Sequence, residues 1–259
     1  MLIDRVAEYA DKILSSTSHR LIDYGFGIRY SYVVMEINGK KYIGVVHTLY
    51  NHMMGKPSPI SIDPGTRISQ LVSSIDPYRR HIGHCMINAV NQYLLAEAGS
   101  SRHLLLDRDP LDIIDPRGKK IVFIGDVRPI VDSVKEYAEE TIVFEAAPCR
   151  RDPAYPPFYY HRVLPRADIV FISGSAVTND SIDEILSSIR PGATTILIGP
   201  SASLPPQPLA GTRITMIASI IIPPDKTDTV RQGLIRGAGT RFIAKQGLKY
   251  IEFIDRTIT

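Results

Sequence analysis

Two short apolar runs, each followed by small polar residues, constrain the fold of this chain most strongly. The first begins at Asp168 and reads Asp-Ile-Val-Phe-Ile-Ser-Gly-Ser, and the second begins at Thr194 and reads Thr-Thr-Ile-Leu-Ile-Gly-Pro-Ser. A polar loop and a helical segment near Ser181 separate them. Strands that are apolar at consecutive positions are buried on both faces, as in a parallel sheet covered by helices. We therefore expect an open α/β sheet with a ligand crevice at its carboxyl edge.

The same alternation of strands and helices extends from residue 119 to residue 259. We predict strands at Lys120–Gly125, Thr141–Ala146, Asp168–Gly174, Thr194–Gly199, Arg213–Ile222 and Lys249–Ile254, and helices at Pro129–Glu139, Ser181–Ile189 and Lys226–Ile235. Alternation of this kind is typical of α/β proteins with a parallel sheet. The second half is thus predicted to be a Rossmann-like, doubly wound parallel sheet domain.

The first half has a different pattern, in which a helix precedes a hairpin and two further helices. Apolar residues at helical spacing predict a helix from Ile3 to Ser16. Two alternating runs, Arg29–Ile37 and Lys41–Leu49, flank Asn38-Gly39, which is the strongest short-range signal for a β-hairpin. Residues 50–66 are predicted to be a loop, and helices are expected at Arg67–Ser74 and His81–Ala98. The first half therefore reads as a small α+β domain.

Composition shifts suggest where the two halves divide. We expect an α+β domain over residues 1–105, a linker over residues 106–118 and the Rossmann-like α/β domain over residues 119–259. The linker assignment rests on Asp109-Pro110 and Asp115-Pro116, because proline disfavours helix both at its own position and at the residue before it. The proline- and tyrosine-rich segment Pro148–Pro165 is predicted to be a long loop near the crevice.

Composition also limits the partners. The chain has 259 residues, 44% of them hydrophobic, which is enough for a sizeable core. A net charge of +3 from scattered Lys and Arg argues against a nucleic-acid partner. No apolar run reaches the roughly 20 residues that span a bilayer, and acids near the N-terminus argue against a signal peptide. We expect a cytoplasmic protein with no membrane partner, free thiols at Cys85 and Cys149, and, if the chain associates, a homodimer.

The loop after the first strand of the second half bears on nucleotide binding. It reads Gly125-Asp126-Val127-Arg128-Pro129 instead of G-x-G-x-x-G. Asp126 would repel a pyrophosphate, and the second glycine of the fingerprint is missing. Glu145, which ends the second strand, stands where an acid that binds a ribose would stand. Gly125, Asp126 and Glu145 are therefore candidate ligand-binding residues, and a nucleotide is not excluded as the ligand.

Small polar residues after the next two strands are further candidates. They are Ser173, Gly174, Thr178 and Asn179 after one strand, and Gly199, Pro200 and Ser201 after the next. The alternative for the first group is that its polarity caps the following helix, with Ser181 and Glu184 as a capping box. The alternative for the second group is a simple bend. Asn88, in an apolar helical turn, either pins the domain or points into the site, because a buried Asn must be hydrogen-bonded.

Three residues of the long helix suggest a metal site. His81, His84 and Cys85 lie at positions i, i+3 and i+4, and imidazole and thiolate ligands suit transition metals such as Zn²⁺ or Ni²⁺. A fourth ligand, such as His47 or His52, would have to come from elsewhere. Neither H-E-x-x-H nor C-x-x-C is present. The alternative is a helix with two histidines and a buried cysteine that hold no metal.

The landmarks together resemble the putative heavy-metal chelation family, whose members join an enolase-N-terminal-like domain to a Rossmann-like domain. The resemblance rests on Ile87-Asn88-Ala89, Ile124-Gly125, Glu145, Leu164-Pro165-Arg166-Ala167-Asp168, Ser173-Gly174-Ser175 with Thr178-Asn179, and Ile198-Gly199-Pro200-Ser201. It implies a site in the cleft between the two domains and a role in handling a metal or a metal chelate. It does not support His81 and His84 as a shared metal site. Where relatives tend to have Asn-Gly-Thr, this chain has Asn179-Asp180-Ser181, which adds an acid.

Three functional hypotheses remain open at this point. The first is a protein that binds or handles a transition metal or metal chelate. Its ligands would be Asp126, Glu145 and Asn179 in the cleft, and the first domain could add His81, His84 and Cys85. The second is a nucleotide- or S-adenosylmethionine-dependent enzyme that uses the Rossmann-like crevice. The third is a scaffold whose cleft only packs two domains together. The sequence leaves open whether the protein is an enzyme.

Overall fold

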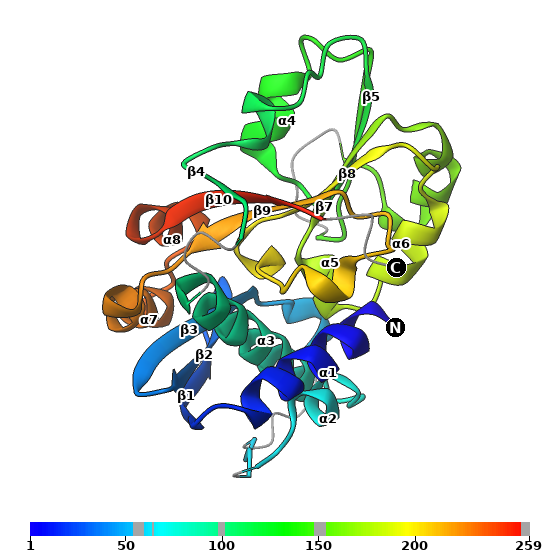
Figure 1. Ribbon diagram of the computed structural model, residues 1–259. Helices are drawn as coiled ribbons and strands as arrows, with labels where there is room; N and C mark the ends of the chain where they lie inside the picture. Colours follow the sequence, from blue (N-terminus) through cyan, green and yellow to red (C-terminus); the bar gives the residue numbers. More distant parts are fainter. Residues whose placement is uncertain (54–59, 64, 98–101, 148–153, 255–259) are drawn as a thin grey trace.

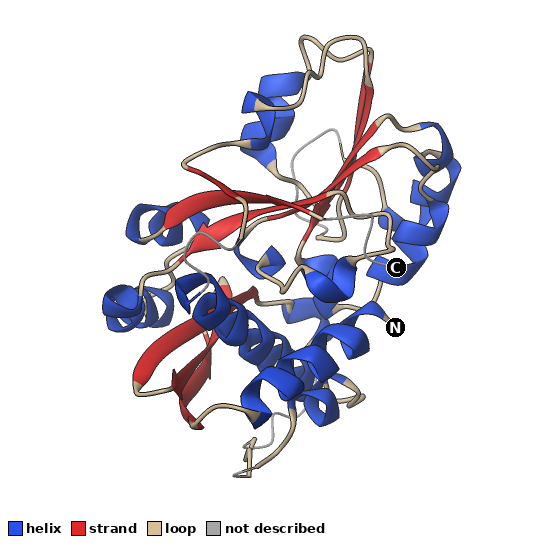
Figure 2. Ribbon diagram, viewed as in Figure 1, coloured by secondary structure: helices blue, strands red, loops and turns tan. Residues whose placement is uncertain are grey.

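The computed structural model describes residues 1–53, 60–63, 65–97, 102–147 and 154–254. It contains a three-stranded sheet and a seven-stranded sheet, with helices packed between and around them (Figures 1 and 2). The small sheet and three helices belong to the first part of the chain, and the large sheet belongs to the rest. This mixed α/β architecture confirms the predicted fold class.

In its described residues, the first part of the chain, which we call the N-terminal unit, has three α-helices and three antiparallel strands. Its elements are α1 (Leu2–Ser15), β1 (His19–Phe26), β2 (Tyr30–Ile37), β3 (Lys40–His47), α2 (Ile68–Val72) and α3 (Pro77–Glu97). The predicted hairpin is confirmed, and Asn38 and Gly39 both have positive φ, as its tight turn requires. β1 was not predicted. It carries a register shift between Leu21 and Asp23 and mixes exposed with half-buried residues, so its alternation is weak.

Helix α3 begins four residues earlier than predicted and lies deep in the molecule. Pro77 is its first residue, a position where the missing N–H costs nothing, and Asp76 accepts a hydrogen bond from Tyr78 N–H at 2.9 Å. Every residue from His81 to Gln92 is buried. The helix approaches β3 closely at Gly44, where an added Cβ would lie 1.8 Å from the carbonyl oxygen of Cys85.

The large sheet has the strand order β4-β10-β9-β8-β7-β5-β6. Its strands are β4 (Leu104–Leu106), β5 (Lys120–Ile124), β6 (Glu140–Phe144), β7 (Ile169–Ser173), β8 (Thr194–Ile198), β9 (Met216–Ile221) and β10 (Leu248–Phe253). The strands from β6 to β9 pair in parallel, whereas β10 is antiparallel to both β9 and β4. The sheet is therefore mostly, not wholly, parallel, and β4 forms within a segment for which no strand was predicted.

Short helices connect these strands and cover the sheet. They are α4 (Arg128–Val134), α5 (Ser175–Thr178), α6 (Ile182–Ser188), α7 (Thr227–Ile235) and α8 (Thr240–Gln246). The chain leaves β5 toward β6 on one side and returns to β7 on the other side. The topological switch point, where ligands bind in many doubly wound folds, thus lies between β5 and β7.

The segment predicted as a long proline-rich loop contains local structure from residue 154 onward. Residues 148–153 lie outside the described part of the chain. After them Tyr155 pairs with Phe144 beside β6, and 3₁₀ turns follow at Pro157–Arg162 and Leu164–Arg166. Among the described residues, no helix is both long enough and apolar enough to cross a membrane.

The N-terminal unit packs against the carboxyl edge of the large sheet, as Figure 1 shows. The N–H of His47 donates to Ser201 Oγ at 2.8 Å, just beyond β8. Gln92 of α3 donates to the carbonyl of Ile220, within β9, at 2.9 Å. It also accepts from the N–H of Ile222, just after β9, at 2.8 Å. One hydrophobic cluster is continuous from α1 and α3 into β7 and β8. We call this contact zone the junction; the domain limits given above stay a prediction.

The close approach of β3 to α3 predicts the effect of one methyl group. Gly44→Ala should lower the free energy of unfolding by about 2 kcal/mol or more, because the methyl would meet backbone atoms that cannot move aside. Urea denaturation at neutral pH measures the change. Gly192→Ala is the control, since its Cβ meets nothing within 4 Å and only its positive φ opposes it. The control should lose about 1 kcal/mol, and equal losses would contradict the packing argument.

Candidate functional site

A small pocket opens where the first turn of α3 meets the end of α5. It has a volume of about 230 Å³ and is lined by His52, Ile75, Pro77, Arg80, His81, Thr178 and Asn179. We call it the junction pocket. The N-terminal unit supplies five of these residues, and the other two are Thr178, the last residue of α5, and Asn179, which follows it. The pocket therefore lies at the carboxyl edge of the large sheet, where the polar residues after β7 were predicted to gather.

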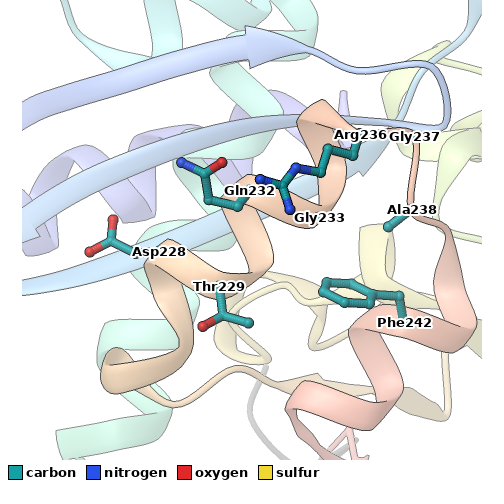
Figure 3. Close-up of a pocket in the computed structure, with 8 residues that line it drawn as sticks. All are labelled: Asp228, Thr229, Gln232, Gly233, Arg236, Gly237, Ala238 and Phe242. Atoms are coloured by element: carbon teal, nitrogen blue, oxygen red, sulfur yellow. The ribbon is translucent and has the colours of Figure 1, made fainter.

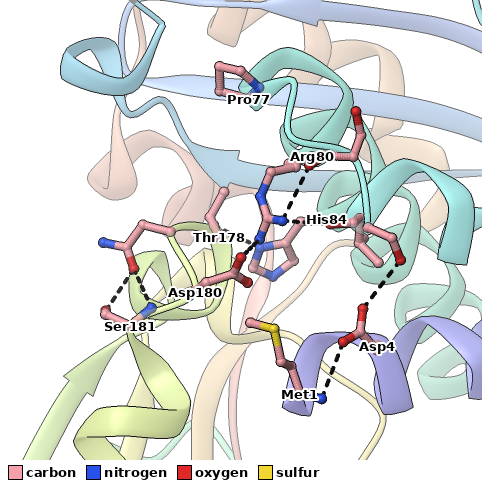
Figure 4. A network of polar contacts seen from close by, with 12 residues as sticks. Met1, Asp4, Pro77, Arg80, His84, Thr178, Asp180 and Ser181 are labelled. Carbon is pink, nitrogen blue, oxygen red and sulfur yellow. Dashed lines mark hydrogen bonds and ion pairs between the residues drawn. The ribbon is translucent and has the colours of Figure 1, made fainter.

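An ion pair joins the two sides of the junction beside this pocket (Figure 4). The guanidinium of Arg80 pairs with Asp180, and its Nη1 donates to the carbonyl oxygens of Val72 at 2.7 Å and Ser74 at 3.4 Å. Asp180 has a φ of 61°, in the left-handed region that favours glycine and is tolerated by Asn and Asp. The extra acid noted in the sequence therefore occupies a turn that suits a glycine, and it ties α6 to α2 and α3 through Arg80.

Asn179 caps the turn that leads into α6. Its Oδ1 accepts hydrogen bonds from the N–H of Ser181 at 3.1 Å and from the Ser181 hydroxyl at 2.7 Å. Because a backbone N–H can only donate, these bonds fix the amide with its nitrogen on the other side. The predicted capping box of Ser181 and Glu184 is not formed, because Ser181 is the N-cap of α6 and makes no side-chain capping bond. The oxygen of Asn179 instead closes the turn before the helix, and its amide nitrogen keeps its donors.

His81 is buried and uncharged. Its Nδ1 lies 2.7 Å from the Pro77 carbonyl, which can only accept, and its Nε2 accepts from Leu49 N–H at 3.2 Å. Burial lowers the pKa of His81 to about 4. The ring is therefore neutral at physiological pH, and both of its nitrogens already have partners.

His84 is more deeply buried, and it bridges α3 and α5. Its Nδ1 lies 2.8 Å from the Thr178 hydroxyl, and the backbone of Ser201 also hydrogen-bonds to the ring. Burial lowers the pKa of His84 to about 3. A neutral imidazole has one donor and one acceptor. If the ring donates to the Ser201 backbone, its Nδ1 accepts the Thr178 proton, so His84 connects α3 with the loops after β7 and β8.

These contacts show whether His81, His84 and Cys85, the metal ligands predicted on α3, are available to a metal ion. Burial raises the pKa of the Cys85 thiol, although a metal ligand must be the thiolate. The nitrogens of His81 and His84 are occupied by hydrogen bonds. In the part of the chain that the structure describes, no three His, Cys, Asp or Glu side chains are grouped so that they could hold a metal ion. The helix therefore presents no preformed set of three ligands.

The residues predicted at the switch point do come together. Gly125, with a φ of 96°, lies so close to β7 that an added Cβ would be 2.7 Å from the Cβ of Ser173. The two carboxylate oxygens of Glu145 accept hydrogen bonds from Asp126 N–H at 3.0 Å and Ala147 N–H at 2.9 Å. Asp126 in turn pairs with Arg128 at 2.8 Å. The loops after β5, β6 and β7 thus form one polar cluster, separate from the lining of the junction pocket.

The remaining predicted residues form close contacts in the junction. A Cβ on Gly174 would lie 2.4 Å from the Ala202 nitrogen, so this glycine permits the loops after β7 and β8 to touch. Gly199 has a φ of 101°, and Pro200 and Ser201 start a short 3₁₀ turn. In the amide orientation that satisfies its neighbours, Asn88 donates to the carbonyls of Pro200 at 3.0 Å and Val45 at 3.2 Å. Asn88 therefore pins α3 between the two sheets and does not line the pocket.

Arg80 was not singled out from the sequence, although it lies beside His81. Charged residues are usually solvated, and nothing local distinguishes Arg80 from Arg79. Its role depends on α2 and on the turn after α5, which are distant in the sequence. The acid at Asp180 was the one available signal, because a new charge next to a predicted site requires a partner.

A second hollow lies between α7 and α8 (Figure 3). It has a volume of about 710 Å³ and is lined by Asp228, Thr229, Gln232, Gly233, Arg236, Gly237, Ala238 and Phe242. None of the predicted site residues lines it. The hollow is an open surface groove away from the loops after β5, β7 and β8, so the junction pocket is the stronger candidate site.

The fold and the pocket define a two-part α/β protein with a site where a small α+β unit covers the carboxyl edge of a doubly wound sheet. The chain belongs to the family described as "Putative heavy-metal chelation" (DUF364), whose model matches residues 109–253. An uncharacterized protein of Methanocaldococcus jannaschii is 34% identical over 237 residues, which cover 87% of this chain and 89% of that protein. The family suggested by the sequence motifs is thereby confirmed.

Solved structures of the same family share this architecture. A protein of unknown function from Pyrococcus horikoshii has 25% sequence identity and a TM-score of 0.84, covering 98% of this chain and all of that one. A protein of unknown function from Desulfitobacterium hafniense has 16% identity and a TM-score of 0.69, over 96% of this chain and 98% of that one. The match with the second protein supports the fold alone.

The buried histidines predict how stability depends on pH. Both folded-state pKa values lie below 6.5, so the unfolded chain binds more protons than the folded chain as the pH falls from 6.5 to about 4. Each histidine should lower the free energy of unfolding by up to about 1.4 kcal/mol per pH unit in that window. Denaturant titrations across this range measure the slope.

Two variants test the origin of that slope. His84→Gln should destabilise the protein at neutral pH but give a shallower pH dependence, because one titrating group is removed. Replacement of His19, which is exposed on β1, is the control for the loss of a histidine outside the core. An unchanged slope in His84→Gln would contradict the assignment.

Proposed function

We propose that this protein binds a small metal chelate in the junction pocket. The observation that carries the proposal is the pocket itself, built by α3 and the loop after β7 in a chain whose family is described by heavy-metal chelation. Pockets at the carboxyl edge of a doubly wound sheet are common ligand sites. The volume of about 230 Å³ suits a small ligand.

The contacts of the histidines favour an intact chelate over a bare ion. A bare transition metal needs free imidazole nitrogens, thiolates or carboxylates, but the nitrogens of His81 and His84 are hydrogen-bonded. A chelate brings metal ligands of its own. The protein then has to recognise only the organic part, for which the polar lining of the pocket is suited.

A nucleotide or S-adenosylmethionine in the switch-point crevice is the second candidate. The contact of Gly125 with Ser173 and the position of Glu145 after β6 favour it. Against it, Glu145 already binds two backbone N–H groups. A thermal-shift assay with NAD, NADP and S-adenosylmethionine tests this function directly, because a ligand of the folded state raises the melting temperature.

Nickel retention tests the proposed function. Untagged protein, purified without chelators or metal-affinity resin, is mixed with nickel citrate or nickel chloride and passed through a desalting column. Elemental mass spectrometry then measures nickel per chain. We expect near-stoichiometric nickel from the citrate complex and little from the chloride.

Paired variants locate the site. Asn179→Ala should lose nickel citrate binding, whereas Glu145→Ala, at the switch point, should retain it. His81→Ala/His84→Ala should not change the small amount of nickel taken from the chloride, and thermal unfolding reports whether each variant is folded. Nickel that binds equally well from the chloride and disappears only in the histidine variant would place a bare-ion site on α3 and contradict the proposal. Loss only in Glu145→Ala would move the site to the switch point.

A further inference from the structure

The lining of the junction pocket has a single formal charge. Of its seven residues, Arg80 alone carries a charge at neutral pH irrespective of histidine protonation, and none is acidic. Arg80 is partly buried, with 18% of its side chain exposed, so water screens it less than a surface charge. The lining itself thus offers a positive charge, which Asp180 outside the lining offsets in part, and it offers no carboxylate to a metal cation.

Arg80 has donors left for a ligand. A guanidinium carries five N–H groups. In Arg80, Nη1 donates to the carbonyls of Val72 and Ser74, and Nη2 pairs with Asp180. By this count, the Nε–H and one N–H of Nη2 remain available to a carboxylate or phosphate, which guanidinium binds with two parallel bonds.

Asn179 adds a second donor to the same pocket. Its oxygen is occupied by the N–H and hydroxyl of Ser181, so its amide nitrogen is the group left for a ligand. Because both bonds to Ser181 go to the oxygen, the amide nitrogen lies on the other side of the group. The nitrogens of His81 offer nothing further, because both are engaged by protein atoms.

We propose that the junction pocket recognises its ligand through an oxyanion, a carboxylate or a phosphate, held by the Arg80 guanidinium and the Asn179 amide. This inference rests on the proposed function and adds the chemical class of the ligand: the chelate enters as an anion through its organic part. Asp180 competes with that anion, because its carboxylate already pairs with Arg80.

Two charge variants give effects of opposite sign. Arg80→Gln should weaken nickel citrate binding about tenfold or more, since it removes charged hydrogen bonds. Asp180→Asn should strengthen binding by about threefold to tenfold, since it removes the competing negative charge. Asn also tolerates the left-handed backbone at this position. Arg80→Lys keeps the charge but loses the planar fork, so its affinity should lie between wild type and Arg80→Gln.

Isothermal titration calorimetry with four probes tests the inference. The probes are nickel citrate, metal-free citrate, inorganic phosphate and nickel chloride, each titrated into the wild type and the three variants. Binding of citrate without phosphate identifies a carboxylate site, and binding of phosphate at equal or higher affinity identifies a phosphate site. Melting temperatures show whether Arg80→Gln is folded. If Arg80→Gln is unfolded, the expected gain of affinity in Asp180→Asn still tests the inference.

The outcomes separate this inference from the proposed function. If nickel citrate binds the wild type, Arg80→Gln and Asp180→Asn with the same affinity, the oxyanion site is wrong but chelate binding stands. Nickel chloride that binds more tightly in Arg80→Gln and more weakly in Asp180→Asn overturns it in favour of a cation site. If citrate or phosphate binds but nickel citrate does not, the result supports the oxyanion site and contradicts the proposed function.

Discussion

The structure depends on one helix that is buried on all sides. From His81 to Gln92 no residue of α3 is exposed, although five of these side chains are polar. Burying a polar group without a partner costs several kcal/mol, so each must find a hydrogen bond in a neighbouring layer. Their partners lie in β3 and the segment after it, in α5, in the loop after β8, and in β9 and the segment after it. The hydrogen bonds of these polar side chains therefore fix how the N-terminal unit lies on the large sheet. The junction pocket forms at the N-terminal end of α3, where the helix is no longer fully buried.

The fold was predictable wherever the chain specifies it locally. The Asn38-Gly39 turn and the runs of apolar residues in β5, β7 and β8 depend on neighbours in the sequence, and their positions were predicted closely. β4 and the antiparallel direction of β10 could not be predicted this way. β4 has only three residues and exists because β10 supplies its hydrogen-bonding partner, more than 140 residues later. β1 likewise gains its strand structure from pairing with β2, despite an irregular pattern.

The candidate site was predictable in position but not in chemistry. Residues after β7 and β8 were expected at one edge of the sheet, and Thr178 and Asn179 do line the junction pocket. The helical spacing of His81, His84 and Cys85 suggested ligands, but spacing carries no information about burial on the opposite face. Because α3 is enclosed, the same imidazoles serve as neutral hydrogen-bonding groups between layers. The role of Arg80 depends on its ion pair with Asp180, and the two residues lie a hundred positions apart in the sequence.

Ligand recognition and the cohesion of the junction share the same atoms. Arg80 connects the end of α2, the first turn of α3 and the turn before α6, and it also lines the pocket. An anion that uses only its free N–H groups adds to these contacts and holds the N-terminal unit more firmly on the sheet. An anion that displaces Asp180 instead releases the turn before α6, and the carboxylate of Asp180 must then be solvated elsewhere. The energetic cost of that release sets a lower limit on how strongly such an anion must bind Arg80, so a compact anion that spares the ion pair is the ligand that this junction favours.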